Sequence, residues 1–311
     1  MAKVDGASEE QSALIFLGTG CSGGVPKAQC LIRPSNPACP VCSQSLSVKP
    51  EHNPNYRCNT SLLIDYCETN GDHNYILIDV GKTFREQVLR WFTYYKIRWV
   101  DCVLLTHEHA DAVHGLDDVC SMHQSALINN ASQLPIYATQ ECMDSVLSRF
   151  PYLRKGEHKQ GVVDWKIIEE NFEKPFIASG LQVYPLPVMH GEDYVALGFL
   201  FGNNCKVAYV SDVSRFPLTT EVVISKDGGR ALDLLILDSN AVIMTRSRST
   251  HFRFPEALDA VKRICPKRAL LTGMTHDYDH EKINMYLREW SEREGIPVQL
   301  AHDGLRVPMD L

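Results

Sequence analysis

The sequence predicts a layered α/β fold. Short apolar runs typical of buried strands alternate with stretches of helical periodicity in both halves of the 311-residue chain. Several polar clusters come directly after an apolar run, and layered α/β proteins carry their ligand-binding and catalytic groups at such strand ends. Apolar residues form 44% of the chain and charged residues 22%, which is the balance of a globular protein rather than a disordered one.

The N-terminal half opens with a predicted buried strand at 13–17 (ALIFL), which ends in a Gly-rich turn. Residues 21–57 are rich in Pro, Ser, Asn and Cys and show no periodicity. We therefore expect a long irregular loop there, ordered by something functional. The other elements expected in this half are strands at 61–65, 75–79 and 101–106, and helices at 82–95, 116–128 and 142–150.

The C-terminal half repeats the alternation of strands and helices. Strands are expected at 181–188, 196–201, 206–210, 232–237 and 268–271, and helices at 254–264 and 279–292. No linker, repeat or low-complexity segment separates the two halves. We expect a flexible N-terminal tail over 1–12, which lacks the basic and apolar regions of a secretory signal, and a single domain over 13–311.

The net charge of −7 and the lack of long apolar runs restrict the partners of the protein. An acidic surface argues against binding nucleic acid regardless of its sequence, although metal ions can still attract a small anionic substrate. No run of 18 apolar residues predicts a membrane-spanning helix. We expect a cytoplasmic protein with a small-molecule substrate, and a homodimer is left open.

The strongest motif is THEHADAVHG at 106–115, directly after an apolar strand. Its His107, His109 and Asp111 alternate, so a turn can direct these side chains toward two adjacent points. Imidazole and carboxylate are the ligands expected for zinc, manganese or iron. Three more candidate ligands each follow a strand-like run later in the chain: His190, Asp212 and His276. This order of strand-end residues predicts a metal centre.

The order HxHxD, a lone His, Asp and a late His resembles the metallo-β-lactamase superfamily over nearly the whole chain. The segments FLGTG, RCNTSLLID, HGLDD at 114–118 and THF at 250–252 narrow the resemblance to the branch of the phosphoribosyl cyclic phosphodiesterases of phosphonate breakdown. The resemblance implies a four-layer αββα sandwich. It also implies hydrolysis of a small, cyclic or linear phosphodiester by a metal-activated hydroxide, with one or two zinc or manganese ions.

The same resemblance implies a role for each matching residue. The first metal would be held by His107, His109 and His190. The second would be held by Asp111 and His276, with Asp212 bridging both. Asp111 and His251 would act in catalysis, His251 as a proton donor to the leaving group, although a loop histidine before a helix is also an ordinary structural feature. Nearby Arg246, Arg248 and Arg253 are either phosphate contacts or solvated surface residues.

One position departs from the superfamily motif. HxHxDH has a second-metal histidine where this chain has Ala112. His114 is an alternative ligand, and an orienting hydrogen bond from it is the other interpretation. We therefore expect the second metal to bind weakly, be lost, or take an extra water.

A second, structural metal is predicted in the irregular loop. Cys39 and Cys42 form a CxxC motif, and Cys30 precedes it by nine residues. The Pro-rich surroundings favour a zinc site over a redox pair, and zinc would order the loop. The resemblance implies a fourth ligand from near the C-terminus, for which we name His280, with Asp279 as the near alternative. Cys21 is a competing thiol.

Two other functions are compatible with the motifs. One is an RNA-processing endonuclease resembling the tRNA 3′-end nucleases, but the chain is acidic and has no basic, Gly-rich arm to grip RNA. The other is a non-catalytic metal-binding scaffold, against which the intact histidines argue.

Overall fold

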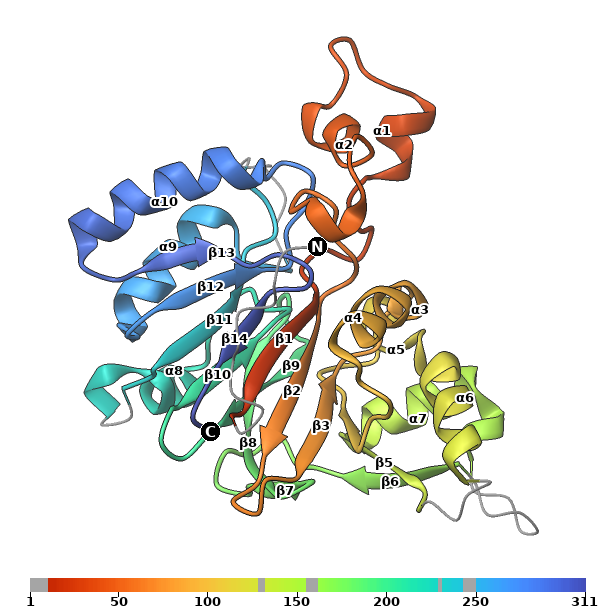
Figure 1. Cartoon of the computed structure of the whole chain (residues 1–311). Coiled ribbons are helices and arrows are strands. Elements are labelled where there is room, and N and C mark those ends of the chain that lie inside the picture. Colours follow the sequence, from red (N-terminus) through yellow and green to blue (C-terminus); the bar gives the residue numbers. More distant parts are fainter. Residues whose placement is uncertain (1–10, 128–131, 155–161, 229–230, 243–249) are drawn as a thin grey trace.

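Two β-sheets lie face to face at the centre of the computed structural model, which describes residues 11–127, 132–154, 162–228, 231–242 and 250–311 (Figure 1). The expected tail over 1–12 lies almost entirely outside the described residues, as do Arg246 and Arg248. In the described part of the chain, no helix combines the length and apolar character needed to span a lipid bilayer.

The first sheet is built mainly from the N-terminal half. In spatial order, its strands within the described ranges are β14 (Arg306–Pro308), β1 (Ala13–Gly18), β2 (Ser61–Cys67), β3 (His73–Ile78), β4 (Cys102–Leu104), β5 (Leu134–Ala138) and β6 (Val163–Ile167). Strands β14 to β3 pair antiparallel, whereas β3 to β6 pair parallel. The C-terminal β14 thus closes the edge beside β1.

The second sheet comes from the C-terminal half. Its described strands, in spatial order, are β13 (Val298–Leu300), β12 (Ala269–Thr272), β11 (Leu234–Asp238), β10 (Val207–Val210), β9 (Val195–Phe201), β8 (Leu181–Met189) and β7 (Phe176–Ala178). Strands β10 to β13 are parallel, so the carboxyl ends of β10, β11 and β12 lie at the same edge.

The strands read as continuous apolar runs because both faces of each sheet are covered. Within β1, Leu14 and Phe16 face the core between the sheets, whereas Ile15 and Leu17 face the helices outside. In β11, Ile236 lies in the core between the sheets and Leu237 packs toward the outer helices. This alternation with a period of two places three apolar layers between four layers of backbone.

Helices cover the outer face of each sheet. Over the first sheet lie α3 (Phe84–Gln87), η2 (Val88–Phe92), α4 (Thr93–Tyr95), α5 (Ala110–Val113), α6 (Leu116–Leu127) and α7 (Gln140–Arg149). Over the second lie α8 (Leu218–Ile224), α9 (Phe254–Ile264) and α10 (His280–Glu294). The short turns η1 (Pro50–His52), η3 (Pro151–Leu153) and η4 (Lys226–Gly228) lie between these elements. The arrangement confirms the predicted αββα sandwich.

Residues 21–57 leave the sandwich and project beyond one end of it (Figure 1). The segment is not wholly irregular, because it contains the short helices α1 (Ala28–Ile32) and α2 (Pro40–Gln44). Helix α1 has no buried residue, so apolar packing does not explain its position. The predicted helix over 82–95 is present, but its middle turn is a π-helix, η2.

Candidate metal centre

The residues of the candidate site lie at the carboxyl ends of strands from both sheets. In chain order they are Asp79 after β3, His107 after β4, His190 after β8, Asp212 after β10, Asp238 at the end of β11, and Gly273 after β12. Parallel pairing of β3 with β4 and of β10 with β11 and β12 brings these ends to one edge of the sandwich. The sheets therefore fix the site before any ligand binds.

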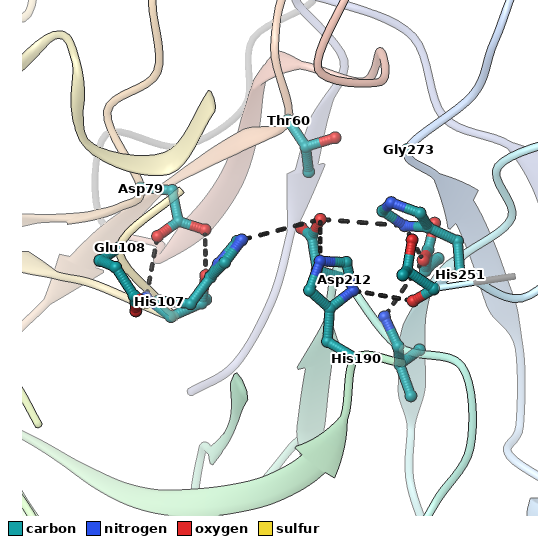
Figure 2. Close-up of polar contacts among 12 residues, drawn as sticks. Thr60, Asp79, His107, Glu108, His190, Asp212, His251 and Gly273 are labelled. Atoms are coloured by element: carbon teal, nitrogen blue, oxygen red, sulfur yellow. Dashed lines mark hydrogen bonds and ion pairs between the residues drawn. The ribbon is translucent and has the colours of Figure 1, made fainter. Parts of the chain in front are cut away.

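His107, His109 and His190 converge. Their ligand nitrogens all lie within 4.8 Å of one another, and the rings of His107 and His109 are 4.6 Å apart. The Nε2 atom of His107 is buried and has no hydrogen-bond partner. Asp212 Oδ1 lies 3.9 Å from that atom and 4.0 Å from His190 Nε2 (Figure 2). Three imidazoles, one of which carries the unpartnered buried nitrogen, and one carboxylate fit one divalent metal ion.

Two of these rings are fixed through their other nitrogen. His107 Nδ1 lies 2.8 Å from Thr106 Oγ1, which donates to Asp79 Oδ2 at 2.8 Å. The hydroxyl of Thr106 therefore accepts from His107 Nδ1. His190 Nδ1 donates to the Thr250 carbonyl at 2.8 Å. Both rings thus present an unprotonated Nε2 to the site, which is the tautomer that binds metal.

The electrostatics favour ligation as well. Burial lowers the pKa of His107, and it lowers the pKa of His190 to about 4. Burial raises the pKa of Asp212, but the surrounding histidines outweigh that effect and the net pKa is lowered. Burial raises the pKa of Asp79 well above the ordinary value. At neutral pH the site therefore offers neutral imidazoles at His107 and His190 and an ionised carboxylate at Asp212.

His251 lies on the other side of Asp212 and is held by Asp238. Its Nδ1 is 2.7 Å from Asp238 Oδ2 and 3.8 Å from Asp212 Oδ1 (Figure 2). Burial lowers the pKa of His251, but the two carboxylates outweigh it and raise the pKa to about 9. Burial raises the pKa of Asp238 to about 6, although the charge of His251 opposes that effect. At pH 7 the pair is an imidazolium beside a carboxylate.

Asp111 lines a small cavity on the same side as His251. The other residues that line this cavity are Gly20, Cys21, Ser22, Thr60, Asp79, Ala112, Ser211, Asp212, Asp238, Asn240, His251 and Gly273. The cavity has a volume of about 10 Å³, which is room for about one water molecule. Cys21 belongs to this cavity and not to the cysteine cluster, and burial raises the pKa of its thiol.

The cysteine cluster lies apart from this centre. The sulfurs of Cys30, Cys39 and Cys42 and a nitrogen of His276 all lie within 4.8 Å of one another. His276 Nδ1 is 3.3 Å from Cys39 Sγ and 3.6 Å from Cys30 Sγ. Three thiolates and one imidazole are the donor set of a closed tetrahedral zinc site.

The predictions for the two C-terminal histidines were wrong. His276 was expected at the second catalytic metal but lies in the cysteine cluster. His280 was expected in the cysteine cluster but is not part of it. Asp279 is no ligand in this arrangement, because it caps α10 by accepting from Lys282 N. His280 is the first residue of α10, and its ring packs 5.8 Å from His302. The loop after β12 brings Gly273, not His276, to the catalytic cavity.

Sequence reasoning missed Asp79 and Asp238. Each is a lone carboxylate, but each closes an apolar strand, in YILID and LLILD. It also missed Tyr194, which stacks on His109 at 5.3 Å between ring centroids and donates to Glu108. His114, the possible substitute ligand, is exposed and packs against Phe150. A strand-final aspartate was the available signal for the first two.

Comparisons with known proteins identify the family and the fold. The family model described as beta-lactamase superfamily domain matches residues 74–274. A crystal structure of a diphosphatase from the PhnP family is 28% identical with a TM-score of 0.76, covering 97% of this chain and 99% of that one. Zn²⁺-bound PqqB from Methylobacterium extorquens is 18% identical with a TM-score of 0.70, covering 96% and 100%.

Two further relatives differ in what they share with the chain. Human tRNase Z, short form, is 16% identical with a TM-score of 0.57, over 95% of this chain and 98% of that one, which is a likeness of fold. An octanoyltransferase from Porphyromonas gingivalis is 30% identical over 264 residues. That match covers 84% of this chain but 46% of the relative, so the chain spans about half the length of that curated protein.

Proposed function

Because the chain belongs to the beta-lactamase superfamily domain family and has its hydrolase fold, we propose that it is a metal-dependent phosphodiesterase acting on a small, linear or cyclic phosphodiester. The observation that carries the proposal is the pairing of the three-histidine pocket with the His251–Asp238 pair across Asp212. One side of the site fits a metal ion, and the other side carries a proton donor.

The metal pocket supports a hydrolytic role. A divalent ion bound by three histidines and a carboxylate supplies Lewis acidity and lowers the pKa of water to about 7. The residues of the chain set the geometry for this, because Asp79 acts through Thr106 to orient His107, and the Thr250 carbonyl orients His190. The donor set suits zinc or manganese, and we propose these as the catalytic metals.

The His251–Asp238 pair supports phosphodiester cleavage. An alkoxide is a poor leaving group and needs a proton as the P–O bond breaks. His251 holds that proton at neutral pH, and buried Asp238 accepts from its Nδ1 and so fixes the ring. The similarity to the PhnP-family diphosphatase over nearly the full length of both chains also supports a substrate in which a P–O bond is cleaved.

The relatives with other names give weaker support for other activities. The likeness to human tRNase Z is one of fold, and the net charge of −7 disfavours an RNA substrate. More than half of the octanoyltransferase lies outside the match, so its name can describe that other part. A non-catalytic scaffold would leave the His251–Asp238 pair without a role.

The proposal is tested by screening purified, metal-replete protein against cyclic and linear phosphodiesters. Its metal content is measured in parallel, and tRNA is included at several salt concentrations. We expect turnover of at least one small phosphodiester by the wild type and none by His107→Ala. Cleavage of tRNA with no small-ester activity would favour the endonuclease. No turnover of any ester by fully metal-loaded protein would favour the scaffold.

A further inference from the structure

We infer that the catalytic centre takes one divalent ion, in the pocket of His107, His109 and His190, and not the pair of ions implied by the HxHxD resemblance. The inference deepens the proposed function, because it states how many ions serve the reaction. It rests on the residues around the second position, which do not fit a metal.

The second position is the cavity beside Asp111. A second ion would need ligands there from Asp111, from the residue after it, and from the loop after β12. The residue after it is Ala112, a buried methyl group that offers no ligand atom. In the regions that the structure describes, no group of side chains that fits a metal ion includes Asp111.

The loop after β12 contributes no ligand because its residue in the cavity is Gly273. Gly273 has φ +75°, and a Cβ atom at this position would lie 2.4 Å from Asp238 Oδ1. Asp238 cannot move aside easily, because its other oxygen is bonded to His251 and to Val213 N. Any side chain at 273, a histidine included, would therefore displace the partner of His251. The glycine is required by the neighbouring pair and excludes a ligand there.

The two other histidines that the sequence offers as ligands for a second ion do not line this cavity. His276, three residues further along the same loop, lies with its Nδ1 3.3 Å from Cys39 Sγ. His114 is exposed and packs on Phe150. Neither compensates for Ala112 or Gly273.

One other arrangement of ligands deserves comparison, because His190, Asp212 and His251 also lie within 4.8 Å of one another. This group is not independent of the first pocket. His190 has its Nδ1 bonded to the Thr250 carbonyl, so Nε2 alone remains for a metal. One Nε2 cannot ligate two ions, and occupancy of either arrangement therefore competes with the other. The centre again holds one ion.

A single ion changes the role of the residues around it. In a two-metal site the second cation stabilises the leaving oxygen. Here the groups on that side of Asp212 are His251 and Asp238. These two side chains, rather than a second metal, would then have to assist departure of the leaving group.

The test counts ions on the full-length protein. The protein is stripped, reloaded with excess zinc, dialysed and measured by plasma mass spectrometry. We expect about two zinc ions per chain, one in the cysteine cluster and one at the histidines. A second sample is loaded with Mn²⁺ and examined by electron paramagnetic resonance, where we expect the spectrum of isolated ions. Three zinc ions per chain, or a spectrum of two coupled Mn²⁺ ions, would overturn the inference.

Variant Asp111→Asn gives an independent reading. If the one catalytic ion lies at the histidines, D111N keeps about two zinc ions per chain. Loss of one zinc ion per chain would contradict the inference. The matched control is His107→Ala, which should fall to about one. These counts do not depend on turnover. A protein with one catalytic ion and no phosphodiesterase activity would refute the proposed function alone. An active phosphodiesterase with two catalytic ions, besides the ion of the cysteine cluster, would refute this inference alone.

Discussion

The two candidate metal sites differ in how the chain builds them. The cysteine cluster lies in a projecting segment with little apolar packing, and its ligands are close to one another in sequence except for His276. The histidine centre lies at strand ends that two packed sheets hold in place. The cysteine cluster offers three thiols and one imidazole, the donor set of a closed structural zinc site, whereas the histidine pocket lies beside a small cavity, as suits a catalytic site with an open position. At the cysteine cluster, a bound metal would order the surrounding segment. At the histidine centre, the two sheets already hold the ligands in position.

The largest effect expected on turnover comes from His107→Ala. Loss of this buried ligand should abolish activity on every substrate and remove one metal equivalent, because the pocket of His107, His109 and His190 then keeps only two of its three imidazoles. Plasma mass spectrometry and turnover on aryl and alkyl esters check this. Loss of zinc from the cysteine cluster as well would show that the two sites do not bind metal independently.

His251→Ala should reduce turnover by roughly 10²–10⁴ while keeping the metal, which is the range for general acid–base groups. The loss should be much smaller for an aryl phosphodiester, whose leaving group needs little protonation. Asp238→Asn is the matched variant, and it should show the same dependence on leaving group with a smaller loss. An equal loss on both ester types would assign His251 to phosphate binding instead.

The pH dependence should follow the His251 pKa of about 9, which lies above the ordinary value of about 6.5. A raised pKa means that the ring is protonated below about 9 and loses its proton as the pH rises through that value. Alkyl-ester turnover should therefore fall roughly fivefold between pH 9 and pH 10, because the protonated fraction falls from about one half to about one tenth. His251→Ala should lack this limb, and a limb that persists in the variant would belong to another group.

Cys39→Ser should have the smallest effect on turnover and the largest on stability. We expect loss of one zinc ion and a Tm lower by about 5 °C or more, because the projecting segment depends on that zinc. Calorimetry and metal analysis measure this, with Cys205→Ser, outside the cluster, as the control. A Tm equal to wild type would mean that packing alone orders 21–57.

Much of the fold follows from patterns that are local in sequence. Long apolar runs such as ALIFL and LLILD predict buried strands, and the period of Phe254–Ile264 predicts α9. The short strands β5, β6, β7, β13 and β14 were missed, because three to five residues with partial burial give too little periodicity. Helices α1 and α2 were missed because each has five residues, which is too short to show a helical period. They are candidates for ordering by metal.

The site was predictable where its residues lie within one motif. His107 and His109 follow a strand together, and CxxC gives Cys39 and Cys42. The assignment of His276 failed because spacing cannot say which residue of a loop enters a cavity. Gly273 is three positions nearer the strand end. Its close approach to Asp238 arises from the tertiary fold, which the sequence pattern does not show. Distant partners need the fold before they can be paired.

The span between Cys39 and His276 bears on how the protein is made. These ligands lie 237 residues apart, so the cysteine site cannot be completed until the segment that carries His276 has left the ribosome. Until then the thiols of Cys30, Cys39 and Cys42 lack their fourth partner, His276. We expect zinc to enter this site late, after the β12–α10 loop has been synthesised and packed. Nascent chains would be exposed throughout synthesis to thiol oxidation and to capture of the wrong metal.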